Sequence, residues 1–181
     1  MSYYKHLEHV AQMNVYRIFD LFNSGILEYG ESGVMSVLSS DCSLSWVCLG
    51  DAPRWLTPVE RTYITAFKIM GAADILKLIR GMVDSVPDGH FQHSSFVVKM
   101  LQATGQDGNV QNIFHVKCGA KFLGTQVLVE MTKDGAATDF DNESRRIGIA
   151  NTRNIECFCE MCFQVDDKEA KISAIEIAFR F

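Results

Sequence analysis

Hydrophobic positions in the first half of the chain recur at helical spacing in several segments. Residues 5–22 carry the first such pattern, an Asn-Ser-Gly stop follows it, and a second, short helix is expected over 31–39. A strong helix start comes at 57–60, where Thr-Pro-Val-Glu combines a capping Thr, Pro at the first helical position and Glu at the third. The pattern predicts that this helix runs to about Met70. A further amphipathic segment, ADILKLIRGMV, predicts one more helix.

Alternation of apolar and polar residues appears first at 42–49 and then through the second half of the chain. The segment CSLSWVCL places its apolar side chains, including Trp46, on one face, and from His90 onward the chain reads as strands. NIFHVKCGAKF alternates in the same way and predicts a half-buried antiparallel strand. The last two segments, NIECFCEMCFQV and KISAIEIAFRF, predict a closing hairpin. Helices followed by a run of antiparallel strands predict an α+β fold.

The length of 181 residues fits one domain, 1–181, that is large enough for a real core. Residues 133–151 are polar and contain Gly, which predicts a long surface loop. The formal net charge is −5 and no Lys/Arg-rich run occurs, so we expect no nucleic-acid contact. No apolar stretch is long enough to span a membrane, and the N-terminus has no signal-peptide core. We therefore expect an intracellular protein, in the cytoplasm or else in an organelle or the nucleus.

Three cysteines lie within six residues of NIECFCEMCF, which raises the question of a metal or redox site. Strand alternation places Cys157 and Cys159 on the apolar face with Met161, and Cys162 on the opposite, mostly polar face. Thiolates on two faces of a strand do not converge on one tetrahedral zinc ion. We expect buried, unreactive thiols, no metal and no cofactor, with a metal or redox role as the alternative. Six Cys without small-scaffold spacing also indicate a reducing compartment.

The remaining candidates for chemistry carry weak signals. None of the motifs HExxH, GxGxxG, GxxxxGK[ST] and GxSxG occurs, so no catalytic or nucleotide-binding signature names a reaction. His90 and His93 are three residues apart in an extended segment, so we expect their side chains to face opposite ways. His115 falls on the polar face of its strand.

Three stretches give the chain a family resemblance. VYRIFDLFNSGILEYGESGVMSVLSSDCSLSW looks like an opening of helix, N-x-G, second helix and D-D-x-x; HVKCGAKFLG is similar to a strand that reads V-x-x-x-G-x-F-x-G; CFQVDDKEAKISAIEIAF resembles a closing F-R-F-x-D-G-K-I hairpin. In this order they resemble the NTF2-like superfamily and its SnoaL-like branch. The resemblance implies an NTF2-like cone, in which N-terminal helices pack in a strongly curved antiparallel sheet around an apolar pocket. Members include steroid isomerases, scytalone dehydratases, polyketide cyclases and non-catalytic transport factors, so the fold does not fix the function.

The resemblance also allows acid/base positions to be carried over. Where the isomerases place a carboxylate at the end of the first strand, this chain has Trp46. Where isomerases and cyclases place an Asp before the closing hairpin motif, it has Met161. The helix-one Tyr of the isomerases falls near Ile18, with Tyr16 close by. Large apolar residues thus stand at both aligned acid/base positions, so the pocket that the resemblance implies lacks its usual proton-transfer groups.

These observations favour a non-catalytic module that binds an apolar small molecule or a protein segment. We expect its ligand pocket to be lined by Trp46, Phe67, Val116, Cys159, Met161 and Phe179. A core that simply fills the pocket is the plainest alternative. The less favoured enzyme alternative is a SnoaL-like isomerase, dehydratase or cyclase acting on a polyketide- or steroid-like substrate. Such an enzyme would have to use Tyr63, His90 or His93 as its acid or base.

The outer face of the expected sheet suggests self-association, since the resemblance implies that such domains pair through this face. The face mixes apolar and charged side chains, and an exposed Phe between charges suits a protein contact better than open water. We expect a homodimer whose contact includes Phe158, Glu160, Cys162 and Arg180.

Overall fold

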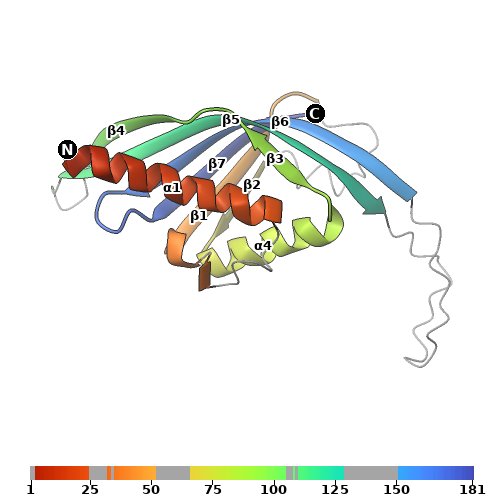
Figure 1. Ribbon diagram of the computed structural model, residues 1–181, viewed down its shortest axis with the longest axis horizontal. Helices are drawn as coiled ribbons and strands as arrows, with labels where there is room; N and C mark the ends of the chain where they lie inside the picture. The colour runs from red at the N-terminus through yellow and green to blue at the C-terminus, as the bar shows by residue number, and fades with distance from the viewer. Residues whose placement is uncertain are drawn as a thin grey trace.

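The computed structural model describes residues 3–24, 32–33, 35–51, 66–104, 108, 110–128 and 151–181. Their helices and strands are, in chain order, α1 (Tyr3–Ser24), β1 (Leu38–Cys48), β2 (Ala66–Met70), α4 (Ala72–Ser85), β3 (His90–His93), β4 (Val97–Thr104), β5 (Val110–Leu128), β6 (Asn151–Asp166) and β7 (Ile172–Arg180). Figure 1 shows the helices grouped beside a single sheet. The predicted α+β class is confirmed.

The seven strands form one sheet in the order β2-β1-β7-β6-β5-β3, and β4 also pairs with β5. Every strand pair is antiparallel except β1 and β7, which run parallel. The sheet is therefore mixed, and our prediction of a fully antiparallel sheet is wrong. Apolar alternation has the same period in both kinds of pairing, so the sequence pattern does not reveal the direction of a neighbouring strand.

The expected strong curvature is also absent, because the sheet remains an open fan (Figure 1). Among the described strands, β2 forms one edge while β3 and β4 form the other, and these edges do not pair. β5 and β6 pair in unbroken register from Ile113–Asp166 to Leu128–Asn151. Bulges are a common cause of sharp bends in a sheet, and this long central pair has none.

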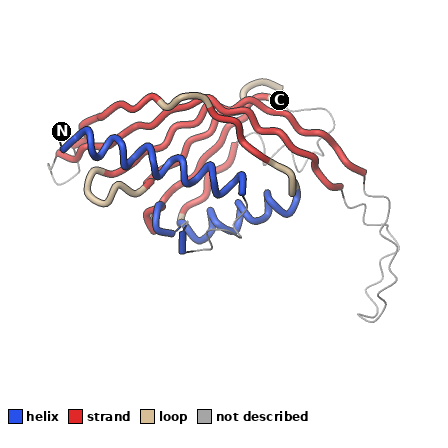
Figure 2. Tube along the Cα trace, viewed as in Figure 1, coloured by secondary structure: helices blue, strands red, loops and turns tan. Residues whose placement is uncertain are grey.

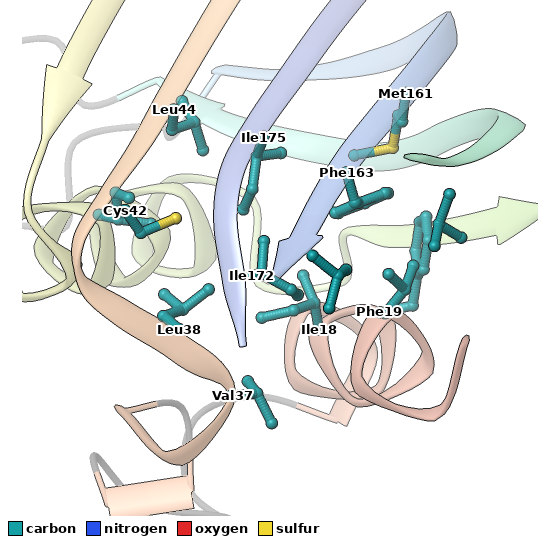
Figure 3. Close-up of a cluster of buried hydrophobic side chains, with 14 of the residues drawn as sticks. Ile18, Phe19, Val37, Leu38, Cys42, Leu44, Met161, Phe163, Ile172 and Ile175 are labelled. Atoms are coloured by element: carbon teal, nitrogen blue, oxygen red, sulfur yellow. The ribbon is translucent and has the colours of Figure 1, made fainter. Parts of the chain in front are cut away.

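Both helices lie on the same side of the sheet (Figure 2), and we call the side that faces them the inner face. The largest buried side chains come from both helices and from the inner face. Figure 3 shows Ile18 and Phe19 of α1 close to Phe163 and Ile172 of the sheet. This cluster is the core of the protein, and its apolar burial is the main stabilising contribution to the fold.

Two helix predictions are corrected near the first strands. Residues 66–70 form strand β2 and not the end of a helix, because Phe67 and Ile69 alternate with exposed neighbours and pair with β1. The capping signals at 57–60 lie outside the described residues. Such signals indicate where a helix starts and do not indicate where it ends. The short helix predicted over 31–39 is confirmed at 32–33 and 35–37, but it ends earlier than predicted because strand β1 begins at Leu38.

The β6–β7 hairpin is confirmed and has a well-connected turn. The Asp166 carboxylate accepts hydrogen bonds from the backbone N–H groups of Lys168, Glu169 and Lys171 at 2.7–3.0 Å. The buried Asn14 side chain of α1 donates to the carbonyl of Ala170 at 2.6 Å. The hydrogen bond ties the first helix to the last hairpin, although the two are far apart in sequence.

The surface loop predicted over 133–151 falls outside the described residues, apart from Asn151, which begins β6. None of the helices that the structure describes has the length and hydrophobicity required to cross a membrane.

Candidate functional site

Cross-strand pairing arranges the inner-face residues in rows that run across the sheet. One row reads Phe67, Trp46, Ile177, Met161 and Cys118, from β2 to β5. The next row reads Cys48, Phe179, Cys159, Ala120 and His93, from β1 to β3. Side chains alternate between the two faces of a strand, so both rows point to the same side as the buried Phe163.

Exposure changes along these rows. Met161 and Cys118 are buried, whereas the residues nearer the β2 edge are only partly buried. The rings of Trp46 and Phe67 stack with centroids 4.3 Å apart and planes inclined by 19°. We call the partly exposed residues of β2, β1 and β7 the aromatic shelf, which consists of Phe67, Trp46, Ile177 and Phe179.

The six predicted pocket residues divide between the shelf and the core. All six share the inner face. Trp46, Phe67 and Phe179 belong to the shelf, while Val116, Cys159 and Met161 are buried in the core. The inward direction of Trp46 and Met161 that alternation predicted is confirmed. A pocket at this position remains a prediction.

The two candidate acid/base residues that the structure describes, His90 and His93, do not gather around the shelf. Tyr63 lies outside the described residues. His90 and His93 face opposite ways, as predicted, because His93 pairs with the inner-face residue Ala120 and His90 pairs with Leu123. His93 is on β3, four strand spacings from β1, which is about 19 Å. Its ring instead contacts Phe19 of α1 and Phe96, at centroid distances of 4.8 and 4.9 Å.

The helix-one position that the resemblance singled out is also away from the shelf. Ile18 is buried in the core. Tyr16 is exposed and contacts His93 and Phe96, with centroids 5.2 and 4.6 Å apart. Tyr16 and His93 therefore belong to an aromatic cluster at the β3 edge of the sheet, which is the edge farther from Trp46.

Most thiols on the inner face are buried and hard to ionise. Burial raises the pKa of Cys42 and of Cys118 to about 12. The Sγ atoms of Cys157 and Cys159 are 3.9 Å apart. Their hydrogen bond raises the pKa of Cys159, which burial raises further, and lowers the pKa of Cys157. The predicted division of this cluster is confirmed, because Cys162 lies on the opposite face and is only partly buried. Among the described residues, no three His, Cys, Asp or Glu side chains converge as a metal site would require.

A groove with a volume of about 910 Å³ is lined by residues of β2, β1, β7, β6 and β5, and its lining includes the inward-facing row of Phe67, Trp46, Ile177, Met161 and Cys118. Outward-facing rows flank this row on both sides, so the groove opens on the outer face of the sheet. Its floor has one charged row and one row of mostly small residues. The charged row reads Lys68, Ser45, Glu176, Cys162 and Lys117. The other row reads Ala66, Val47, Ala178, Glu160 and Gly119. At the β5 side, Ser94 joins the wall because its hydroxyl accepts a hydrogen bond from the Gly119 N–H at 3.0 Å. We call this hollow the outer groove.

The four residues expected in a dimer contact all point outward but lie in different places. Phe158 and Arg180 pair with each other in a row beyond the groove. Phe158 is 56% exposed, and the Lys121 ammonium lies 5.4 Å from its ring centroid. Glu160 and Cys162 line the outer groove. A contact through this face remains a prediction.

Sequence reasoning missed the pairing of Cys162 with His115. Alternation put each of them on the polar face of its own strand, but it gave no register between the two strands. In the structure the Cys162 Sγ lies 3.8 Å from the His115 Nδ1. Only the β5–β6 register, which pairs Lys117 with Cys162, brings these residues together.

No protein-family model matches the sequence, and no curated protein matches it. Solved structures resemble it in fold. A candidate SnoaL-like polyketide cyclase from Shewanella denitrificans OS-217 matches over 94% of this chain and 90% of its own, with 9% identity and a TM-score of 0.53. A second such candidate, from Jannaschia sp. CCS1, covers 93% and 85% at 9% identity and a TM-score of 0.51. An NTF2-like protein of unknown function from Burkholderia pseudomallei K96243 covers 93% and 88% at 11% identity and a TM-score of 0.51.

The chain has the NTF2-like fold, which confirms the fold that the resemblance implied. Identities this low concern the fold alone. Because one fold supports many functions, the function has to be argued from the faces of the sheet.

Proposed function

We propose that this chain is a non-catalytic binding module that takes a flat, apolar small molecule against the aromatic shelf. The observation that carries the proposal is the stacked, partly exposed pair of Trp46 and Phe67. A planar ring added to this pair continues an existing stack and meets Ile177 and Phe179 beside it. Burial of apolar ligand surface contributes roughly 25 cal/mol per Å², so ring stacking alone supports an affinity of about micromolar.

The identity of two inner-face residues supports binding without catalysis. By the resemblance, Trp46 and Met161 stand at the positions where isomerases and cyclases of the NTF2-like superfamily hold carboxylates. His93 is about four strand spacings from Trp46, so it is out of hydrogen-bond reach of a ligand on the shelf. The module is thus built to hold an uncharged ligand.

We also propose that the chain forms a homodimer through the outer face at Phe158. An aromatic side chain that is 56% exposed and flanked by Lys121 and Arg180 suits the centre of a protein contact. Because Phe158 and Arg180 are on the outer face, dimerisation there is compatible with ligand binding on the inner face.

A titration with flat polycyclic ligands tests the binding function. The sequence has two Trp residues, so a Trp55→Phe variant leaves Trp46 as the sole indole reporter. We expect its fluorescence to change on ligand addition, and calorimetry to give an affinity that Trp46→Ala or Phe67→Ala weakens by about tenfold. Val47→Ala, a change on the outer face of the same strand, is the matched control and should leave the affinity unchanged.

Two results would reject the proposal. Absence of any heat and any fluorescence change across the ligand panel would indicate a filled core. Conversion of a bound ligand that survives Trp46→Ala but disappears in His93→Ala or Tyr63→Phe would establish an enzyme instead.

A further inference from the structure

The Cys162 thiol is placed differently from the other thiols. All six cysteines lie in the described part of the chain, and only Cys48 and Cys162 are partly exposed. Cys48 ends β1 on the inner face, in the row of Phe179. Cys162 lies on the floor of the outer groove, and its Sγ is 3.8 Å from the Nδ1 of His115. Cys162 therefore combines access, a neighbouring base and a built cavity.

The outer groove presents charges of both signs around this thiol. Lys117 pairs with Cys162 on one side and Glu176 pairs with it on the other, each about one strand spacing or 5 Å away. Lys68 lies three strand spacings from Cys162, or about 14 Å, in the same row. Glu160 adds a second carboxylate in the neighbouring row. The row thus has an ammonium group at each end and a carboxylate between them.

This charge pattern is complementary to a small peptide that carries two carboxylates and one ammonium group. Lysine ammonium groups attract carboxylates, and the carboxylates of Glu176 and Glu160 attract an ammonium group. A tripeptide is about 10 Å long, because an extended chain advances about 3.3 Å per residue. Bonded to the Cys162 sulfur, it places one carboxylate beside Lys117, while Lys68, about 14 Å away, adds to the positive potential of the row. The groove volume of about 910 Å³ accommodates a molecule of this size.

We propose that Cys162 is a thiol–disulfide exchange site for the disulfide form of a small, zwitterionic peptide thiol. His115 accepts the Cys162 proton at Nδ1, and the thiolate attacks one sulfur of the disulfide. That S–S bond breaks as the new bond to Cys162 forms. The released half leaves as a thiolate and takes up a proton from His115 or water. Cys162 is oxidised, one half of the small disulfide is reduced, and no other oxidant is needed.

The local electrostatics favour exchange at alkaline pH. Burial raises the pKa of Cys162, Lys117 lowers it and Glu176 raises it, with a net increase over its ordinary value. The resting group is therefore a thiol, and the proton transfer to His115 precedes attack. The rate should rise with pH, since a larger fraction of Cys162 is then ionised.

Site-resolved mass spectrometry after a timed reaction tests the proposal. The probes are glutathione disulfide, which carries the expected charges, and bis(2-hydroxyethyl) disulfide, which is neutral. We expect glutathione disulfide to modify Cys162 several times faster than Cys48, while the neutral disulfide shows little preference between them. Lys117→Gln should reduce the preference for glutathione disulfide over the neutral disulfide by about two- to fivefold. Because Lys117 lowers the pKa of Cys162, its loss should also slow the neutral reaction, so the ratio of the two rates is the readout. His115→Ala should slow both reactions at Cys162.

Lys5→Gln serves as the matched control, because Lys5 is an exposed lysine on α1, on the opposite side of the sheet, and does not line the groove. It should leave both rates unchanged. The proposal would be overturned if the ratio of the Cys162 rate to the Cys48 rate were the same for glutathione disulfide and for the neutral disulfide. Slow reaction of Cys162 with both probes would also overturn it, since the groove would then be covered in solution. The readout is the modification of Cys162 and Cys48 and not the binding of a flat ligand, so this result and the ligand titration can fail independently.

Discussion

Asn14 shows how a single side chain connects distant parts of this fold. It is buried on α1, and its Nδ2 donates to the Ala170 carbonyl at 2.6 Å. Asn14→Ala removes the donor and leaves a buried carbonyl without this partner. We expect the free energy of unfolding to fall by about 1–3 kcal/mol in denaturant melts. Met13→Ala, at the exposed neighbouring position, should cost roughly half a kcal/mol or less. Equal losses in both variants would show that the Asn14 hydrogen bond is not important.

Asp88 gives a pH-dependent contribution at the residue scale. Its carboxylate accepts a hydrogen bond from the Thr125 N–H at 2.6 Å, and this bond lowers the pKa of Asp88 below its ordinary value of 3.8. A lowered pKa in the folded state means that the stabilisation is present above the unfolded pKa and is lost as the pH falls through the folded pKa. Asp88→Asn should therefore be less stable than wild type at pH 7, and this difference should shrink below pH 3.8.

Melts of both proteins at several pH values would measure this effect. Asp84→Asn, a change at an exposed position on α4, is the control. A difference between Asp88→Asn and wild type that stayed constant down to about pH 2 would contradict the role of the ionised carboxylate.

At the scale of elements, strand β6 provides the sharpest test of side-chain direction. Phe163 is fully buried on the inner face, and Glu160 is exposed on the outer face. Phe163→Ala should reduce the free energy of unfolding by about 3–5 kcal/mol, and Glu160→Ala by roughly half a kcal/mol or less. A larger loss for Glu160→Ala in denaturant melts would mean that the register of β6 is shifted by one residue.

The same strands show how far the sequence could predict this fold. Alternation in β5, β6 and β7 correctly gave the strands and their buried faces, because one face of each packs on a core. β2 was missed because it has only five residues, and the strong helix start that precedes it led us to extend a helix through them. The parallel pairing of β1 with β7 was missed because side chains alternate every two residues in both parallel and antiparallel strands.

The candidate sites were predictable to different degrees. Trp46 and Met161 could be placed on the inner face from their own strands alone. The stacking of Trp46 on Phe67 depends on the β1–β2 register, and the contact of Cys162 with His115 depends on the β5–β6 register. Register is a property of two segments, so the pattern within one segment does not supply it.

For the whole molecule, the exposed Phe158 on the outer face leads us to expect a homodimer. Sedimentation at tens of micromolar should show a dimer for the wild type and a monomer for Phe158→Glu, because the new carboxylate would be buried in the contact. Val110→Glu is the matched control, since Val110 is 63% exposed but lies at the start of β5, far along the sheet from Phe158 and outside the groove. A monomeric wild type, or a dimer that tolerates Phe158→Glu, would contradict the proposed contact.

Methionine methyl NMR in the presence of a flat polycyclic ligand tests the central claim most directly, because two methyl groups report on the two faces. Met161 lies on the inner face in the row of Trp46, and Met70 is exposed on the outer side of β2. We predict that the ligand shifts the Met161 signal through its ring current, leaves the Met70 signal in place, and is recovered chemically unchanged. A ligand that shifts Met70 but not Met161, or that is recovered as a converted product, would contradict a non-catalytic binding site on the inner face.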